Sequence, residues 1–479
     1  MNPIFRGLSV SLFALTAAAC TTPNPQPLSR DGDVPPAFTA PIADQSPIWP
    51  ETNWWINFHA DELPALEETA QRENLDLAAA AARVIQSEAN AGVAFSALLP
   101  TVNLQGGATR TSTRATTPGG SKTSNLLTGG LAASYEIDFW GLSQDKLRQA
   151  RETLRASRYA AAVVGLTTSA SVANQYFTVL AARERITIAR QNIEAAKRIM
   201  AVTQAKVSNG VSSNLDLAQQ QATVAQQEAR VPLLIEQERE ARYALAILLG
   251  RAPEGFDVNA QNLHGVISPA MKPGLPSAVL ERRPDVAQAE AQLFAAHANL
   301  DAARAAFFPH LGLTGSGSYA SAAVGSLINP ATLAWSVGAT LLQSVFDGGR
   351  LSSQDDLAKV QQTELVANYR KVVFSAFNDV ENALGQTRAF SDQIVSLTEQ
   401  VRASTEAFRI AELQYREGTI DILSLLQTQQ SLFTAEDSLV QAKLSRLSAN
   451  VSLYRALGGG WTQTGADEAY EPQLDWWPL

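Results

Sequence analysis

Leu99-Pro100-Thr101-Val102-Asn103-Leu104 has a counterpart later in the chain, Phe308-Pro309-His310-Leu311-Gly312-Leu313. The shared proline stands at 100 and again at 309, an offset of 209 residues. Three further landmarks keep an offset of 208 or 209 residues: Ile137–Ser143 with Val345–Ser352, Asn209–Val211 with Glu417–Thr419, and Leu248–Gly250 with Ala456–Gly458. Four landmarks with nearly one offset indicate a duplicated unit, and they predict two structural repeats, 51–262 and 263–460.

Each repeat contains stretches that alternate with the period of a β-strand. Residues 131–139 and 333–341 place apolar side chains at every second position, with polar or small residues between them. Weaker strands are expected at 101–109 and 310–319, followed by loops rich in Gly, Ser and Thr. Four strands per chain are therefore predicted. Such alternation over about ten residues is typical of outer-membrane barrels, which need about eight strands or more, so several chains must share one barrel.

The rest of the chain is predicted to be helical. No proline occurs between Pro118 and Pro232 or between Pro330 and Pro472, so uninterrupted helices are allowed. Residues 141–208 would form a helix of roughly 100 Å, whose narrow Ala, Val and Leu stripes suit coiled-coil packing. Turns centred on Gly210 and Gly418 predict returning helices at 214–249 and 421–457. We expect Pro232 to kink or break the first returning helix.

Composition disfavours several function classes. The chain has 46 acidic and 37 basic residues, a formal charge of −9, which argues against nucleic-acid binding. No nucleophile motif is present, and the four histidines lack metal-ligand spacing: His59, His264, His297 and His310. We therefore expect no enzyme activity, no cofactor and no bound metal. The three methionines give weak support against a thioether-lined copper or silver route.

The N-terminus reads as an export signal. Arg6 precedes an apolar stretch, and Ala17-Ala18-Ala19 provides a cleavage site before Cys20, the single cysteine of the chain. Residues 15–20 resemble a bacterial lipobox, which implies acylation of Cys20 and, with Thr21 after it, sorting to the outer membrane. An ordinary secreted protein cut after Ala19 is the alternative. We predict a signal peptide at 1–19, a lipid anchor and proline-rich tether at 20–50, and a C-terminal tail at 461–479.

The stretch from Leu275 to Val286, which includes Arg282-Arg283-Pro284-Asp285, resembles the outer-membrane efflux protein (TolC-like) family, as do Ala289-Glu290 and Ala302–Pro309. The pattern is most similar to NodT-type lipoprotein channels of tripartite pumps of the resistance-nodulation-division class. The resemblance implies a homotrimer with a 12-stranded outer-membrane barrel above a periplasmic tunnel of long antiparallel helices. The predicted fold class is mostly α with a small β part, internally duplicated. Proline at a helix start with aspartate in the first turn is ordinary helix chemistry, so this run is expected to join the halves.

The resemblance also implies where the functional residues lie. A periplasmic adaptor protein would dock at two helical tips: Ser208, Asn209, Gly210 and Val211, and Arg416, Glu417, Gly418 and Thr419. Gate candidates are Asp216, Asp421 and Ser424, because family members often carry carboxylates one helical turn apart at this constriction. This chain departs from that pattern at Ser424, which corresponds to Asp216 by the 208-residue offset. Taken alone, Asp421 is better interpreted as a solvated helix cap.

The expected function is export of drugs or other toxic compounds by a trimeric duct working with an adaptor and an inner-membrane pump. Service to a type I protein secretion system is the alternative. A passive porin would form its barrel from one chain, and a structural coiled coil would not explain the alternating strands.

Overall fold

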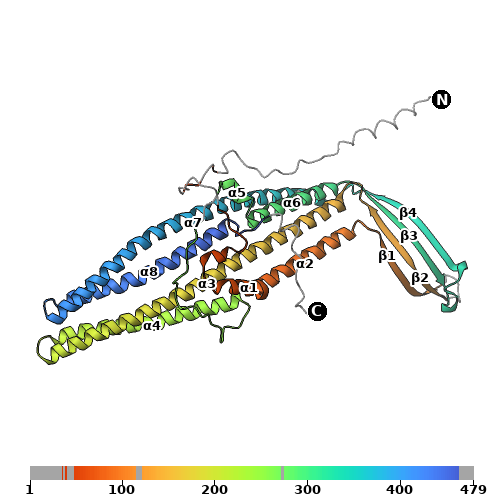
Figure 1. Ribbon diagram of the computed structural model, residues 1–479. Coiled ribbons are helices and arrows are strands. Elements are labelled where there is room, and N and C mark those ends of the chain that lie inside the picture. The colour runs from red at the N-terminus through yellow and green to blue at the C-terminus, as the bar shows by residue number, and fades with distance from the viewer. Residues whose placement is uncertain (1–34, 36–37, 40–47, 115–120, 271–273, 463–479) are drawn as a thin grey trace. The chain divides into compact units, whose positions relative to one another are not determined.

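The computed structural model describes residues 35, 38–39, 48–114, 121–270 and 274–462 (Figure 1). Cys20, the predicted signal peptide and most of the predicted tether and tail therefore lie outside the described residues. The helices and strands are η1 (Trp54–Phe58), α1 (Leu63–Glu73), α2 (Leu75–Ser96), β1 (Thr101–Arg114), β2 (Ser121–Ile137), α3 (Leu142–Ser208), α4 (Asn214–Leu248), α5 (Pro276–Leu280), α6 (Pro284–Ala305), β3 (His310–Ser321), η2 (Val324–Ser326), η3 (Pro330–Thr332), β4 (Leu333–Leu342), α7 (Arg350–Glu417) and α8 (Ile422–Ala456). The predicted fold class, mostly α with four strands, is confirmed.

The described strands form one antiparallel sheet in the order β1-β2-β3-β4. The two central strands come from different repeats and pair over a long register, from Leu127 opposite Ser321 to Ile137 opposite Leu311. β1 and β4 each have a pairing partner on one side within this sheet.

The strands of the first repeat are longer than predicted. β1 continues to Arg114, and β2 begins at Ser121, ten residues before the alternation that marks it in the sequence. Residues 121–130 are rich in Ser, Thr and Gly and were expected to be loop. Their extended form follows from pairing with β1, because an intact ladder satisfies the backbone whatever the side chains are. β2 ends at Ile137 rather than Phe139, because the Asp138 carboxylate accepts a hydrogen bond from the Gln144 N–H in the first turn of α3.

The register gives the sheet two different faces. Val102, Val337, Leu104 and Trp335 lie on one face and are 64 to 83 % exposed. The opposite face carries rows of hydroxyl and amide groups; one row is Thr101, Ser134, Thr314 and Gly338, and the next is Asn103, Ala132, Ser316 and Ser336. The alternation therefore separates an exposed apolar face from a polar one.

The returning helix α4 is continuous through Pro232, so the predicted break is absent. Pro232 is exposed, whereas Val224 and Leu234 on either side of it are buried. Packing of both flanks holds the helix together, and water can reach the carbonyl of Glu228 that the missing N–H leaves without a donor. None of the helices among the described residues combines the length and apolar character needed to cross a membrane.

The chain divides into two compact units that do not coincide with the sequence repeats. The strand unit contains Glu88–Thr153 and Glu290–Ala367, and the helical unit contains the described parts of Arg30–Ser87, Leu154–Ala289 and Asn368–Leu479. Each unit thus draws on both repeats.

The core of the helical unit joins the two repeats. Trp54 stacks on Tyr454 of α8 at 5.0 Å between ring centroids, and Phe58 packs against Phe177 of α3 at 5.3 Å. All four rings are almost completely buried. Aromatic side chains of this size provide much of the apolar burial, so the first and second repeats fold around a common centre.

Candidate functional site

Both predicted tips end their long helices in the same way. The N–H groups of Gly210 and Val211 bond to the carbonyls of Val207 and Lys206 at 3.0 and 2.8 Å. At the second tip the N–H groups of Gly418 and Thr419 bond to the carbonyls of Tyr415 and Gln414 at 3.1 and 2.9 Å. Both glycines have positive φ, 71° and 75°, as this helix stop requires. The eight predicted tip residues are all exposed.

The gate candidates lie at the starts of the two returning helices, and the repeats exchange their roles. In α4, Ser213 is the N-cap and Asp216 the third helical residue; the Ser213 hydroxyl accepts from the Asp216 N–H at 3.2 Å. In α8, Asp421 is the N-cap and accepts from the Ser424 N–H at 2.8 Å. The interpretation of Asp421 as a helix cap is confirmed. Each repeat therefore keeps one carboxylate and one hydroxyl at its cap, in opposite order.

Both carboxylates are held in the charged form. Hydrogen bonds from the Ser212 hydroxyl and the Ser213 N–H lower the pKa of Asp216. The backbone and side chain of Ser424 lower the pKa of Asp421, and the charge of Asp216 opposes that shift. The chain thus presents two ionised groups, close enough to repel, at the beginning of its returning helices.

The tips are joined by contacts that the sequence did not predict. The Lys206 ammonium donates to the Tyr415 carbonyl and lies 4.4 Å from the centroid of the Tyr415 ring. The Thr203 and Tyr415 hydroxyls are 3.0 Å apart, and Thr203 is fully buried. These residues connect α3 to α7 one turn from the tips. No signal in the sequence could have found them, because position 414, the repeat counterpart of Lys206, is a glutamine.

The opposite ends of the returning helices show the role of the Arg282–Asp285 run. The Arg283 guanidinium donates to the carbonyl of Ala456, the last residue of α8, and pairs with Asp285 and Asp379 at 2.6 and 3.0 Å. In the first repeat Asn74 donates to the carbonyl of Leu248, the last residue of α4, at 2.7 Å. Each side chain precedes a helix and closes the end of another, which supports a structural role for this run.

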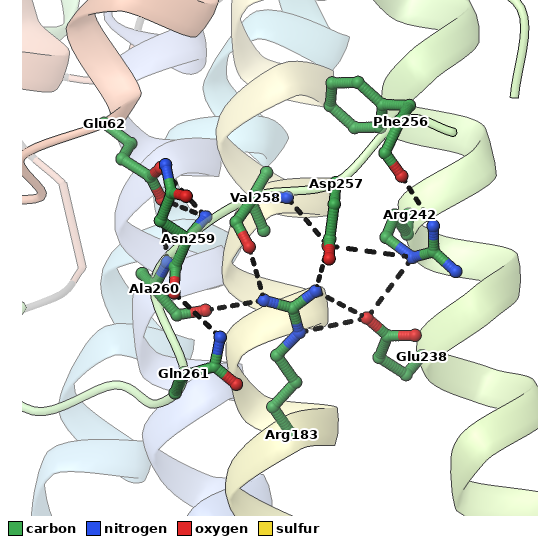
Figure 2. Close-up of polar contacts among 10 residues, drawn as sticks. All are labelled: Glu62, Arg183, Glu238, Arg242, Phe256, Asp257, Val258, Asn259, Ala260 and Gln261. Atoms are coloured by element: carbon green, nitrogen blue, oxygen red, sulfur yellow. Dashed lines mark hydrogen bonds and ion pairs between the residues drawn. The ribbon is translucent and has the colours of Figure 1, made fainter. Parts of the chain in front are cut away.

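A second polar network anchors the loop that follows α4 (Figure 2). The Arg183 guanidinium of α3 donates to the carbonyls of Val258 and Ala260 at 2.6 and 2.9 Å and pairs with Glu238 and Asp257. The Glu62 carboxylate accepts from the backbone N–H groups of residues 259 and 260. These bonds satisfy loop groups, and no group of three or more metal-binding side chains occurs among the described residues.

A family model described as outer membrane efflux protein matches residues 66–251 and 275–459, one segment in each predicted repeat. The chain belongs to the outer membrane efflux protein family. It is 38% identical over 466 residues to the pyoverdine export outer membrane protein OpmQ of Pseudomonas aeruginosa, covering 95% of this chain and 97% of the relative. It is 32% identical to the antibiotic efflux pump outer membrane protein ArpC of Pseudomonas putida, covering 90% and 93%.

The fold agrees with this membership. The outer-membrane channel OprN superposes with a TM-score of 0.82 at 28% sequence identity, covering 91% of this chain and all of that one. The predicted family, the outer-membrane location and the role as an efflux channel are therefore confirmed.

Proposed function

We propose that this chain is the outer-membrane channel of a tripartite efflux pump, assembled as a homotrimer that moves small organic molecules outward and catalyses no reaction. A periplasmic adaptor protein and an inner-membrane pump of the resistance-nodulation-division class are its partners. The relatives named for pyoverdine export and antibiotic efflux support small-molecule cargo over the alternative of type I protein secretion.

The observation that carries the proposal is the sheet. Four strands expose an apolar face, a polar face and two edges, and a strand edge in lipid must find a partner. Three chains, each adding four strands, would close a 12-stranded barrel with its apolar face toward lipid. The polar rows would then line the lumen.

We assign adaptor docking and gating to the ends of the long helices. The exposed tips, Ser208 to Val211 and Arg416 to Thr419, are proposed as the adaptor-docking surface. Asp216 and Asp421 of three chains form the proposed gate, where crowded negative charge selects cations, with Ser424 beside them as a cap donor.

The proposed function also assigns a role to each segment of the chain, including the N-terminal residues that the structure does not describe. We propose that residues 1–19 are removed as a signal peptide and that Cys20 is acylated. Residues 20–50 then tether the channel to the inner leaflet of the outer membrane. The assigned repeats, 51–262 and 263–460, build the channel, and residues 461–479 form its tail.

The first test is the mass of the mature protein in mild detergent, measured by light scattering corrected for detergent. Three chains per particle are expected. A stable monomer that inserts into membranes would refute the shared barrel.

The second test is ion selectivity in planar bilayers. The double variant Asp216→Asn, Asp421→Asn keeps helix capping but removes six charges from a trimer. Asparagine is as good an N-cap as aspartate at position 421, and at position 216 its side-chain carbonyl can still accept from the Ser213 N–H. The cation-to-anion permeability ratio should fall several-fold. Asp356→Asn, Glu364→Asn, which removes the same number of charges from α7, should change it little. Equal ratios in wild type and the gate variant would contradict the gate assignment.

A further inference from the structure

The strand unit contains a groove whose lining is cationic. The groove has a volume of about 480 Å³ and lies among the first turns of α3 and α7 and the last turns of α6. Its charged or titratable lining residues are Lys146, His310 and Arg350, and no carboxylate lines it. The amides of Gln149, Gln354 and Gln361 add hydrogen-bonding groups, and alanine and leucine side chains add apolar surface.

Two other cations in the same unit are neutralised by carboxylates. Arg148 pairs with Asp145 and Asp301 at 2.9 and 2.6 Å, and Lys359 pairs with Asp355 at 2.5 Å. Lys146 differs from them, since it is exposed and has no ion-pair partner among the described residues. The charge of the Lys146 ammonium is therefore available to a ligand.

Arg350 and His310 have partners that leave capacity for a ligand. Arg350 is 3.8 Å from Asp347, whose carboxylate is already engaged by the N–H groups of Gly349 and Leu351. The His310 Nδ1 atom lies 2.6 Å from a Glu136 carboxylate oxygen, so the Nε2 atom remains available. The Arg350 side chain is 58 % exposed and can turn toward a bound anion.

The groove is on the polar side of the sheet. In the register, His310 shares its face with Thr314 and Ser316, which belong to the hydroxyl and amide rows. Under the proposed function that face lines the lumen, so a molecule passing from the helices to the sheet would meet the groove. An apolar floor beside fixed positive charge is complementary to an organic anion.

We propose that this groove is a binding site for the anionic group of exported organic anions, in which Lys146 and Arg350 make the principal contacts. The site rests on the proposed function, because it needs the polar face to line a conducting channel. The groove itself then favours carboxylates, sulfonates or phosphates attached to an apolar body.

The test measures block of single-channel current by the full mature protein in phosphatidylcholine bilayers. The probe is 2-naphthalenesulfonate, and the neutral match is 2-naphthol. The double variant Lys146→Gln, Arg350→Gln should need about tenfold more sulfonate for half block, while block by naphthol stays unchanged. Lys146→Arg, which keeps the charge, should behave as wild type. Arg402→Gln, which removes a cation paired with Glu399 on its own helix, serves as the matched control.

Two further arms separate the possible failures. Repeating the measurement with phosphatidylglycerol in the bilayer distinguishes the source of the anion. If wild type loses its sulfonate block there, while block of the double variant is the same in both lipids, lipid occupies the groove and the export role is overturned. If wild type and the double variant need the same sulfonate concentration for half block, the binding site is overturned and the proposed function is not. Absence of wild-type channels would overturn the proposed function and this site with it.

Discussion

Glu67 of α1 is fully buried, and neither of its carboxyl oxygens has a hydrogen-bond partner among the described residues. The Ser169 hydroxyl favours the charged form, but its geometry falls short of a hydrogen bond. Burial dominates and raises the pKa of Glu67 from 4.5 to about 8. At neutral pH the native protein therefore holds a proton that the unfolded chain has released.

This buried proton makes stability depend on pH. A group that binds its proton more tightly in the native state contributes fully below the unfolded pKa of 4.5, and that contribution is lost as pH rises toward 8. Glu67→Gln removes the effect. Its free energy of unfolding relative to wild type should increase by about 3 kcal/mol between pH 5 and pH 8. Denaturant unfolding at fixed protein concentration across this range measures the difference.

The neighbouring residue provides the control. Glu68 is exposed and pairs with Arg72 at 2.7 Å, so Glu68→Gln should alter stability by less than about 0.5 kcal/mol at every pH. Parallel pH profiles for wild type and Glu67→Gln would mean that the carboxyl group is solvated or paired in the native protein.

Among the elements, α4 carries an interior proline without breaking. Pro232 provides no N–H for the carbonyl of Glu228, and the ring crowds the preceding turn. Pro232→Ala should restore the bond and stabilise the protein by about 1–3 kcal/mol. Hydrogen exchange of amides 229–236 should slow in the variant. Gln226→Ala, an exposed change on the same helix, should leave exchange unaltered, and faster exchange in Pro232→Ala would show that the native geometry needs proline.

Some of the helices and turns could be located from the sequence, and others could not. Proline-free stretches and glycine stops located α3, α7 and both tips, because these signals act locally. The continuity of α4 depends on packing of Val224 and Leu234, and the early part of β2 depends on pairing with β1, so neither was visible in a local pattern. The Lys206 to Tyr415 contact joins residues whose repeat counterparts, Gln414 and Val207, are of other types, and only the fold brings them together.

At the scale of the whole molecule, the duplication extends to single backbone contacts. Gly250 and Gly458, at the ends of α4 and α8, have φ of 68° and 87°. A Cβ atom at Gly250 would overlap the carbonyl of Glu73, and one at Gly458 would overlap the carbonyl of Arg282. The two carbonyls are themselves repeat counterparts. In each half, the end of the returning helix therefore packs closely against a backbone carbonyl of the same half.

This equivalence predicts matched effects. Gly250→Ala and Gly458→Ala should each destabilise the protein by at least about 2 kcal/mol, because strain at positive φ adds to a clash with backbone. Gly210→Ala, with φ of 71° but open space around it, should cost only about 1 kcal/mol. Thermal unfolding of the three variants tests this order. If Gly250→Ala lowers the unfolding temperature no more than Gly210→Ala does, the backbone of Gly250 does not pack closely against the Glu73 carbonyl.

The sealed helix ends also bear on chain connectivity. Glu73 meets Gly250 and Arg282 meets Gly458 without crossing from one half to the other, while the ring cluster of Trp54, Phe58, Phe177 and Tyr454 holds the halves together without a covalent link. The helix-end contacts therefore lie within each half, whereas the aromatic cluster and the pairing of β2 with β3 join the two halves. In evolutionary terms, fusion of the two copies would have fixed their ratio at one to one and left each free to diverge, as the exchanged serine and aspartate caps have done.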